Sequence, residues 1–131
     1  MRVTPLYAGL LTPLFIFLAV RVIGARRSAK VAIGDGGDDD LRRRMRVRGN
    51  FSEYVPLALI LMGLAESLSA DQRWLHLLGL VLLVERLSHA FGVSRAPEVF
   101  AFRTAGIAMI FAVLTAGSLT CPALACLAPA I

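Results

Sequence analysis

Residues 3–20 read VTPLYAGLLTPLFIFLAV and contain no charged side chain. A helix needs about 20 mostly apolar residues to cross the hydrocarbon core of a bilayer, so this stretch predicts a membrane-spanning helix. A basic flank with Arg21, Arg26 and Arg27 follows, as is typical of a stop-transfer segment. Because no small-residue cleavage site follows either, we interpret the stretch as a helix and not as a cleaved signal peptide.

Three further apolar runs follow the first one. Thr104 to Ile131 has no charge, Trp74 to Val84 has none, and Phe51 to Ala65 is interrupted only by Glu53. The chain is 57% hydrophobic and 18% charged, against about 45–50% and about 25% in soluble domains. We therefore expect one all-α membrane domain, residues 1–131, with three helices as the weaker alternative to four. The expected helices are 3–23, 41–69, 72–93 and 100–120, with a loop at 24–40.

The positive charge of the chain is concentrated in one loop and its helix ends. Between Arg21 and Arg48 there are nine basic residues and four aspartates, a net of +5, whereas the rest of the chain has no net charge. Cytoplasmic loops carry such a basic excess, so we expect loop 24–40 in the cytoplasm and both termini outside. The Ala90–Phe102 loop, with Arg95, is then also cytoplasmic. Attraction to anionic lipid headgroups is the expected use of the basic residues.

Several other binding functions fit the sequence poorly. The basic segment has no aromatic residue for stacking bases, which argues against nucleic acid. The aspartate-rich stretch 34–40 lacks the ligand spacing of a calcium loop, and we expect it to cap the next helix. His76 and His89 have no third ligand nearby, so no metal is expected. Cys121 and Cys126 either form a disulfide or remain free thiols.

The most informative polar residues lie on the expected second helix. At about 100° per residue, Arg46, Asn50, Glu53 and Tyr54 fall on one helix face. Polar groups at membrane depth are costly and usually mark a site. Arginine binds a carboxylate with two hydrogen bonds, and a glutamate accepts from an ammonium group, so a small zwitterion suits this face. The competing interpretation is that Arg46 and Glu53 pair with other helices only to stabilise the bundle.

Polar residues on the third and fourth helices also allow two interpretations. Arg86 and His89 lie one turn apart, and Glu85 is spaced to pair with His89. These residues form either an internal ion pair or part of a ligand site. Arg103, at the start of the fourth helix, either reaches a ligand on the second helix or extends to the lipid headgroups.

The pattern Arg46-x3-Asn50-x2-Glu53-Tyr54, followed by Pro56, resembles the second-helix signature of the MAPEG family, the membrane-associated proteins of eicosanoid and glutathione metabolism. Two more segments resemble the small bacterial inner-membrane branch of this family, and the likeness covers about residues 1–115. These segments are Val31-Ala32-x-Gly34-Asp35-Gly36-Gly37 and Gly79-x5-Glu85-Arg86-Leu87-x-His89.

The resemblance implies four-helix subunits in a homotrimer, with glutathione between neighbouring subunits near the cytosolic face. It assigns glutathione to five residues, Arg46, Asn50, Glu53, Tyr54 and Arg86, and makes Arg103 the nearest candidate for activating the thiol. His89, a possible secondary ligand, and Val93 stand where eicosanoid enzymes have tyrosines. Small residues are expected to permit close packing on association; they are Gly63, Gly79, Gly106 and Gly117.

We therefore expect a glutathione-dependent transferase or peroxidase that acts on lipophilic electrophiles from the bilayer, with glutathione as co-substrate and no metal. The alternative is a non-catalytic membrane binding or scaffold protein that retains the fold. A small transporter is less favoured, because no span shows a Gly/Pro interruption at its midplane. The expected location is the bacterial inner membrane, with both termini periplasmic. Expected partners are membrane lipid, further copies of the chain and a lipophilic small molecule, but no nucleic acid.

Overall fold

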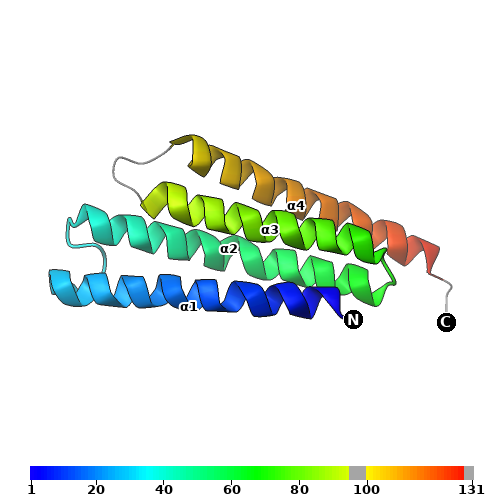
Figure 1. Ribbon diagram of the computed structural model, residues 1–131, viewed down its shortest axis with the longest axis horizontal. Helices are drawn as coiled ribbons and strands as arrows, with labels where there is room; N and C mark the ends of the chain where they lie inside the picture. Colours follow the sequence, from blue (N-terminus) through cyan, green and yellow to red (C-terminus); the bar gives the residue numbers. More distant parts are fainter. Residues whose placement is uncertain (95–99, 129–131) are drawn as a thin grey trace.

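The computed structural model describes residues 1–94 and 100–128, with the side chains of residues 93 and 94 outside that description. The expected cytoplasmic Arg95 and the side chain of Val93 lie outside the described residues. Four helices run antiparallel to their neighbours in sequence (Figure 1). They are α1 (Val3–Ala29), α2 (Asp39–Ser67), α3 (Gln72–Ser94) and α4 (Phe100–Leu127).

α1 and α2 are longer than predicted where they meet the loop between them, and this loop is correspondingly shorter. α1 continues through its basic flank to Ala29, because Arg26 and Arg27 in its last turn complement the helix dipole. α2 begins two residues earlier than predicted, after the N-cap Asp38, whose side chain accepts the Leu41 N–H at 2.8 Å. The prediction that the aspartate-rich stretch caps the second helix is therefore confirmed.

The two ends of the bundle differ in their chain connections. α1 begins and α4 ends at the same end, and the α1–α2 loop lies at the opposite end (Figure 1). At the first end, the Glu66 carboxylate near the end of α2 accepts the backbone N–H groups of Arg2, Val3 and Thr4. The first N–H groups of a helix have no partner within the helix, so Glu66 caps α1 from the neighbouring helix.

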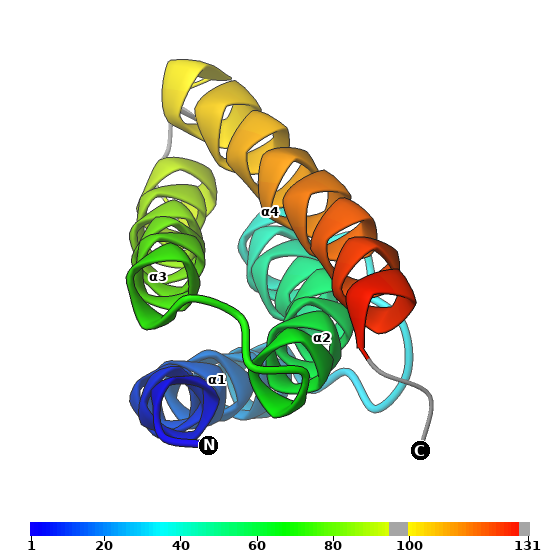
Figure 2. The same ribbon diagram turned by 90° about the vertical axis from the view of Figure 1, so that its right-hand side faces the viewer.

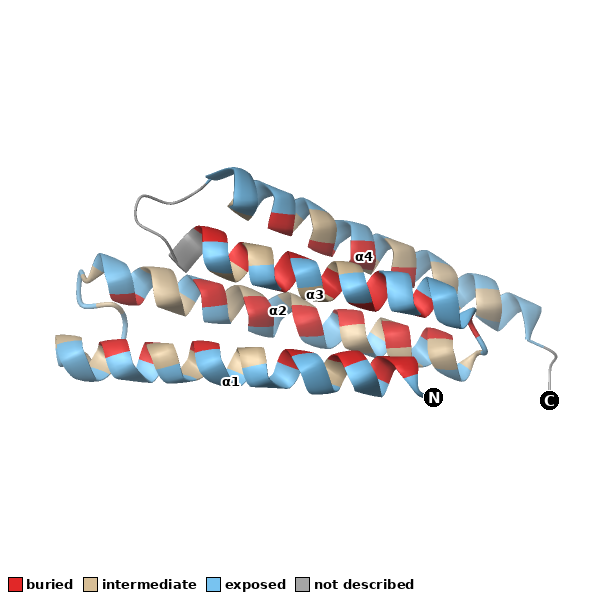
Figure 3. Ribbon diagram, in the orientation of Figure 1, coloured by how far each residue is buried: buried red, intermediate tan, exposed pale blue. Residues whose placement is uncertain are grey.

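α2 and α3 each pack against the other three helices of the bundle (Figure 2). Buried side chains face inward on every helix, whereas the outward faces of α1 and α4 are exposed and apolar (Figure 3). Lipid is the environment that such faces require. The core contains Leu11, Leu18, Phe51, Val55, Met62, Leu75, Leu82, Ile110 and Val113.

Three helices, α1, α3 and α4, are long and apolar enough to span a membrane by themselves. α2 has 29 residues and is therefore about 43 Å long, whereas the hydrocarbon core is about 30 Å thick. Its arginine-rich first turns can lie outside that core. The apolar run 51–65 covers only about 22 Å, so the neighbouring residues of α2 complete the crossing. The fold is the predicted all-α membrane bundle.

The glycines expected to serve association pack inside the chain instead. A Cβ atom at Gly79 would overlap the ring of Tyr7, and one at Gly106 would lie 3.0 Å from the Cβ of His89. Gly117 is equally close to Leu61, and Gly63 faces Thr4. These residues let the helices of one subunit approach closely, so they do not explain contact between subunits.

Candidate functional site

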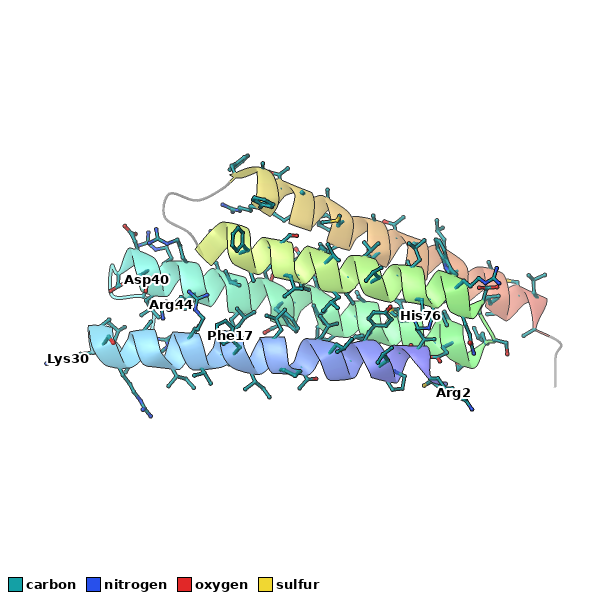
Figure 4. All side chains as sticks on the ribbon, in the orientation of Figure 1. Arg2, Phe17, Lys30, Asp40, Arg44 and His76 are labelled. Carbon is teal, nitrogen blue, oxygen red and sulfur yellow. The ribbon has the colours of Figure 1, made fainter. Side chains whose placement is uncertain are left out.

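The described residues line an open cavity of about 570 Å³ at the end of the bundle that carries the α1–α2 loop. α2, α3, α4 and this loop all contribute to its wall. Figure 4 shows Lys30, Asp40 and Arg44 at this end, and Arg2 and His76 toward the other. The polar side chains that matter most are Arg42, Arg46, Asn50, Glu53, His89 and Arg103.

α2 supplies one side of the cavity through a single helical stripe. Arg42, Arg46, Asn50 and Glu53 are spaced by four, four and three residues, which places them on one face. Tyr54 belongs to the predicted set but does not line the cavity. Its ring packs edge-on against Phe111 of α4, with the ring centroids 5.7 Å apart. The structure thus brings three of the four predicted α2 residues together at the cavity.

A residue of α3 holds the Asn50 side chain in position from the buried side of the cavity. Glu85 and Arg86 are 0% and 2% exposed and form a buried ion pair. The prediction of an internal ion pair is correct, but Glu85 pairs with Arg86 and not with His89. Arg86 Nη1 also donates to Asn50 Oδ1 at 2.5 Å. Since arginine can only donate, the Asn50 oxygen faces α3 and its NH2 group remains a donor for the cavity.

His89 and Arg103 approach the α2 stripe from the remaining two helices. His89 is buried at 4% exposure on α3, and Arg103 is half-buried in the first turn of α4. The close contact at Gly106 brings α4 against His89, because any side chain there would press on the His89 Cβ. Both residues line the same cavity as Arg46 and Glu53. Arg103 therefore lies on the same cavity as the α2 stripe.

The α1–α2 loop also contributes to the cavity, which the sequence did not predict. Gly34 and Asp35 line the cavity together with Arg42. Asp35 Oδ2 lies 2.6 Å from Arg42 Nε, and its Oδ1 accepts the Gly37 N–H at 3.0 Å. The side-chain hydrogen bond from Arg42, reinforced by the Gly37 N–H, lowers the pKa of Asp35 from its ordinary value of 3.8. The signals available in the sequence were the Gly-Asp-Gly-Gly pattern and the four-residue step from Arg42 to Arg46.

The remaining candidate groups take no part in the cavity. Cys121 and Cys126 are free thiols, and Cys121 Sγ donates to the backbone oxygen of Leu61 at 3.3 Å. In the part of the chain that the structure describes, no three His, Cys, Asp or Glu side chains gather as metal ligands. The polar side chains of the cavity are arginines, carboxylates, one amide and one imidazole.

Fold and cavity together define a small helical membrane protein with a cationic, polar site at one end. The chain belongs to the MAPEG family, whose sequence profile matches residues 4–123. It is similar to the inner membrane protein YecN of Escherichia coli K12, with 35% identity over 112 residues, 86% of this chain and 84% of YecN. YecN of E. coli O6:H1 (strain CFT073) gives the same identity and coverage.

Proposed function

We propose that this protein binds glutathione in the cavity and uses its thiolate against lipophilic electrophiles or hydroperoxides that arrive from the bilayer. The observation that carries the proposal is the convergence of Arg46, Asn50, Glu53 and Arg103 on one cavity of about 570 Å³. A volume of that size is within the usual range for small-molecule sites, about 300–1,000 Å³.

The charges of the cavity suit the groups of glutathione, which has two carboxylates, one ammonium group and a thiol. Arg46 offers a planar fork of N–H donors for a carboxylate. Glu53 can accept from the ammonium group, and the Asn50 NH2, which Arg86 leaves free, can donate to a carbonyl. In this proposal Arg86 acts by positioning Asn50, and Tyr54 by supporting α4 through Phe111.

Arg103 is assigned to the thiol. A free thiol with a pKa of about 8.5 is only about 3% ionised at pH 7, and lowering that pKa by about two units ionises most of it. The thiolate sulfur would then attack an electrophilic carbon and expel a leaving group with its electron pair. With a hydroperoxide, sulfur would attack the terminal oxygen, the alcohol would leave with a proton, and a second glutathione would reduce the sulfenic acid to disulfide and water.

A homotrimer is part of the proposal. Glu53 is exposed in the single chain within the part of α2 that crosses the hydrocarbon core, and Arg46 is exposed two turns away at the edge of that core. Charged side chains facing lipid are costly, so a neighbouring subunit over the α2 stripe would stabilise them. This argument replaces the one from small residues, which pack within the chain.

We also propose an orientation. The cavity lies at the end with the arginine-rich loop, and the positive-inside rule assigns that end to the cytoplasm. The start of α1 and the end of α4 would then face the periplasm, with the protein in the bacterial inner membrane. Glutathione would enter the cavity from the cytosol, and the electrophile would enter from lipid.

A non-catalytic binding protein is the second candidate, and one observation favours it. Tyr54 packs against Phe111, so within the described residues no phenol points into the cavity to assist the thiol. A binding protein would retain affinity for glutathione without activating its sulfur.

The two candidates are separated by the ionisation of bound glutathione. The purified protein is mixed with glutathione, and the ultraviolet absorbance of thiolate is followed together with turnover of a chlorodinitrobenzene and of cumene hydroperoxide. An active enzyme gives a thiolate signal at neutral pH that Arg103→Gln removes. Binding without thiolate or turnover supports the non-catalytic candidate, and no binding rejects both.

A further inference from the structure

The α1–α2 loop, residues 30–38, is a built part of the cavity wall. Arg26 Nη1 donates to the backbone oxygens of Ala32 and Gly34, at 3.3 and 2.8 Å. The Asp38 N–H donates to the backbone oxygen of Asp35 at 2.9 Å and closes a turn. These bonds fix the loop against the end of α1, so the position of Asp35 at the cavity is defined by the fold.

The glycines of this loop are required by its backbone. Gly34, Gly36 and Gly37 have φ values of 70°, 56° and 80°, in the left-handed region that side chains disfavour. A Cβ atom at Gly36 would also lie 2.5 Å from the Val31 Cγ2 atom. The Gly-Asp-Gly-Gly pattern therefore allows the tight loop that places Asp35 at the cavity.

Asp35 in turn holds the Arg42 side chain in position. Arg42 Nε is 2.6 Å from Asp35 Oδ2, and Arg42 Nη1 is 3.1 Å from Asp39 Oδ1. A guanidinium has five N–H donors, so most of them remain after these two contacts. The Arg42 side chain is 53% exposed and lines the cavity. It is a cation of fixed position with donors to spare at the mouth of the site.

We propose that Arg42 binds the second carboxylate of the thiol ligand, that of the glycyl end, and that Asp35 is its positioning residue. The inference rests on the proposed function and extends it to ligand selection. If Arg46 and Glu53 take the amino-acid end and Arg103 takes the sulfur, the glycyl carboxylate still lacks a cation. Arg42 is the other cation among the cavity-lining residues that the structure describes.

The length of the site agrees with this assignment. Arg42 and Glu53 are eleven residues apart on α2, roughly 16 Å along the helix axis. An extended tripeptide spans about 11 Å, and the long arginine side chain can cover the difference. A thiol without the second carboxylate would leave the Arg42 donors unused. The site should therefore select a dicarboxylate thiol over a monocarboxylate one.

The test compares glutathione with its glycyl monoethyl ester, which keeps the thiol, the ammonium group and the other carboxylate. Both are titrated by calorimetry into wild type, Arg42→Gln, Arg42→Lys and the control Arg48→Gln, which removes an exposed arginine of α2 outside the cavity-lining set. Wild type and Arg48→Gln should prefer glutathione by about tenfold. Arg42→Gln should reduce that ratio to near one while leaving the ester's affinity unchanged, and Arg42→Lys should give an intermediate ratio.

Three results overturn the inference. The first is a wild type that binds both thiols equally, and the second is an Arg42→Gln variant that keeps the wild-type ratio. In both cases the proposed function survives, because glutathione still binds. A wild type that binds neither thiol rejects the proposed function and this inference with it.

Discussion

Arg86 on α3 donates through Nη1 to Asn50 Oδ1 on α2 at 2.5 Å, while Glu85 neutralises the same guanidinium from the adjacent position. This contact joins the buried part of the bundle to the cavity. It fixes which end of the amide faces the ligand, because arginine has no acceptor to offer. The buried Glu85–Arg86 pair thus determines that Asn50 offers a donor, its NH2 group, to the cavity.

Breaking this pair from one side should destabilise the fold. Arg86→Met leaves the Glu85 carboxylate buried without a partner, which costs about 3–5 kcal/mol. The double variant Glu85→Leu/Arg86→Met removes both charges and should recover most of that loss. Thermal unfolding in detergent measures both. Equal melting temperatures of the single and double variants would show that an unpaired Glu85 carboxylate does not destabilise the fold.

The Asp35 carboxyl should titrate below 3.8, because Arg42 and the Gly37 N–H stabilise its charged form. A folded pKa below the unfolded one means that the contact stabilises the loop above about pH 4 and that this contribution is lost as the pH falls through the lowered pKa. The carboxyl carbon chemical shift of Asp35 reports the midpoint. Arg42→Gln should move it upward, whereas Arg48→Gln should leave it in place; no response to Arg42→Gln would contradict the assigned cause.

The orientation can be tested with a cysteine in the loop. Ile33 is 91% exposed and avoids the strained backbone of the loop glycines, so Ile33→Cys suits a background lacking Cys121 and Cys126. A membrane-impermeant thiol reagent should label this cysteine only after the inner membrane is permeabilised. Labelling in spheroplasts with an intact inner membrane would reverse the proposed topology.

The proposed homotrimer can be tested by measuring the mass of the assembly. If a neighbouring subunit covers the exposed Glu53 carboxylate, as proposed, native mass spectrometry in mild detergents should give trimers. Monomers alone in every mild detergent would remove this support for an intersubunit site.

The sequence predicted the helices well because apolar runs dominate a membrane fold. It also identified the α2 part of the cavity, since Arg46, Asn50 and Glu53 share a helix face by spacing alone. The convergence of His89 and Arg103 on that face depends on the close contact at Gly106, which no periodicity reveals. The loop remained hidden for a similar reason. Asp35 was interpreted through its local aspartate-rich context, whereas its role depends on Arg42 one helix turn into α2.

Tyr54 shows the limit of helical-wheel reasoning. Its angular position is compatible with the cavity stripe, but α4 packs on that edge of α2 and Phe111 takes the contact. The same applies to Arg86, whose partner choice between Glu85, His89 and a ligand is decided by packing and not by spacing.

The central claim, that the cavity binds glutathione, is tested most directly by thermal melts with and without glutathione. Wild type should be stabilised, by about 1.4 kcal/mol at ten times the Kd. Glu53→Gln and Arg46→Lys should fold but gain much less, because a lost charge-assisted contact costs about 2–5 kcal/mol of binding. Arg48→Lys, outside the cavity-lining set, should gain as wild type does. If wild type shows no stabilisation at millimolar glutathione, the proposal that the cavity binds glutathione is wrong, and only the description of the fold remains valid.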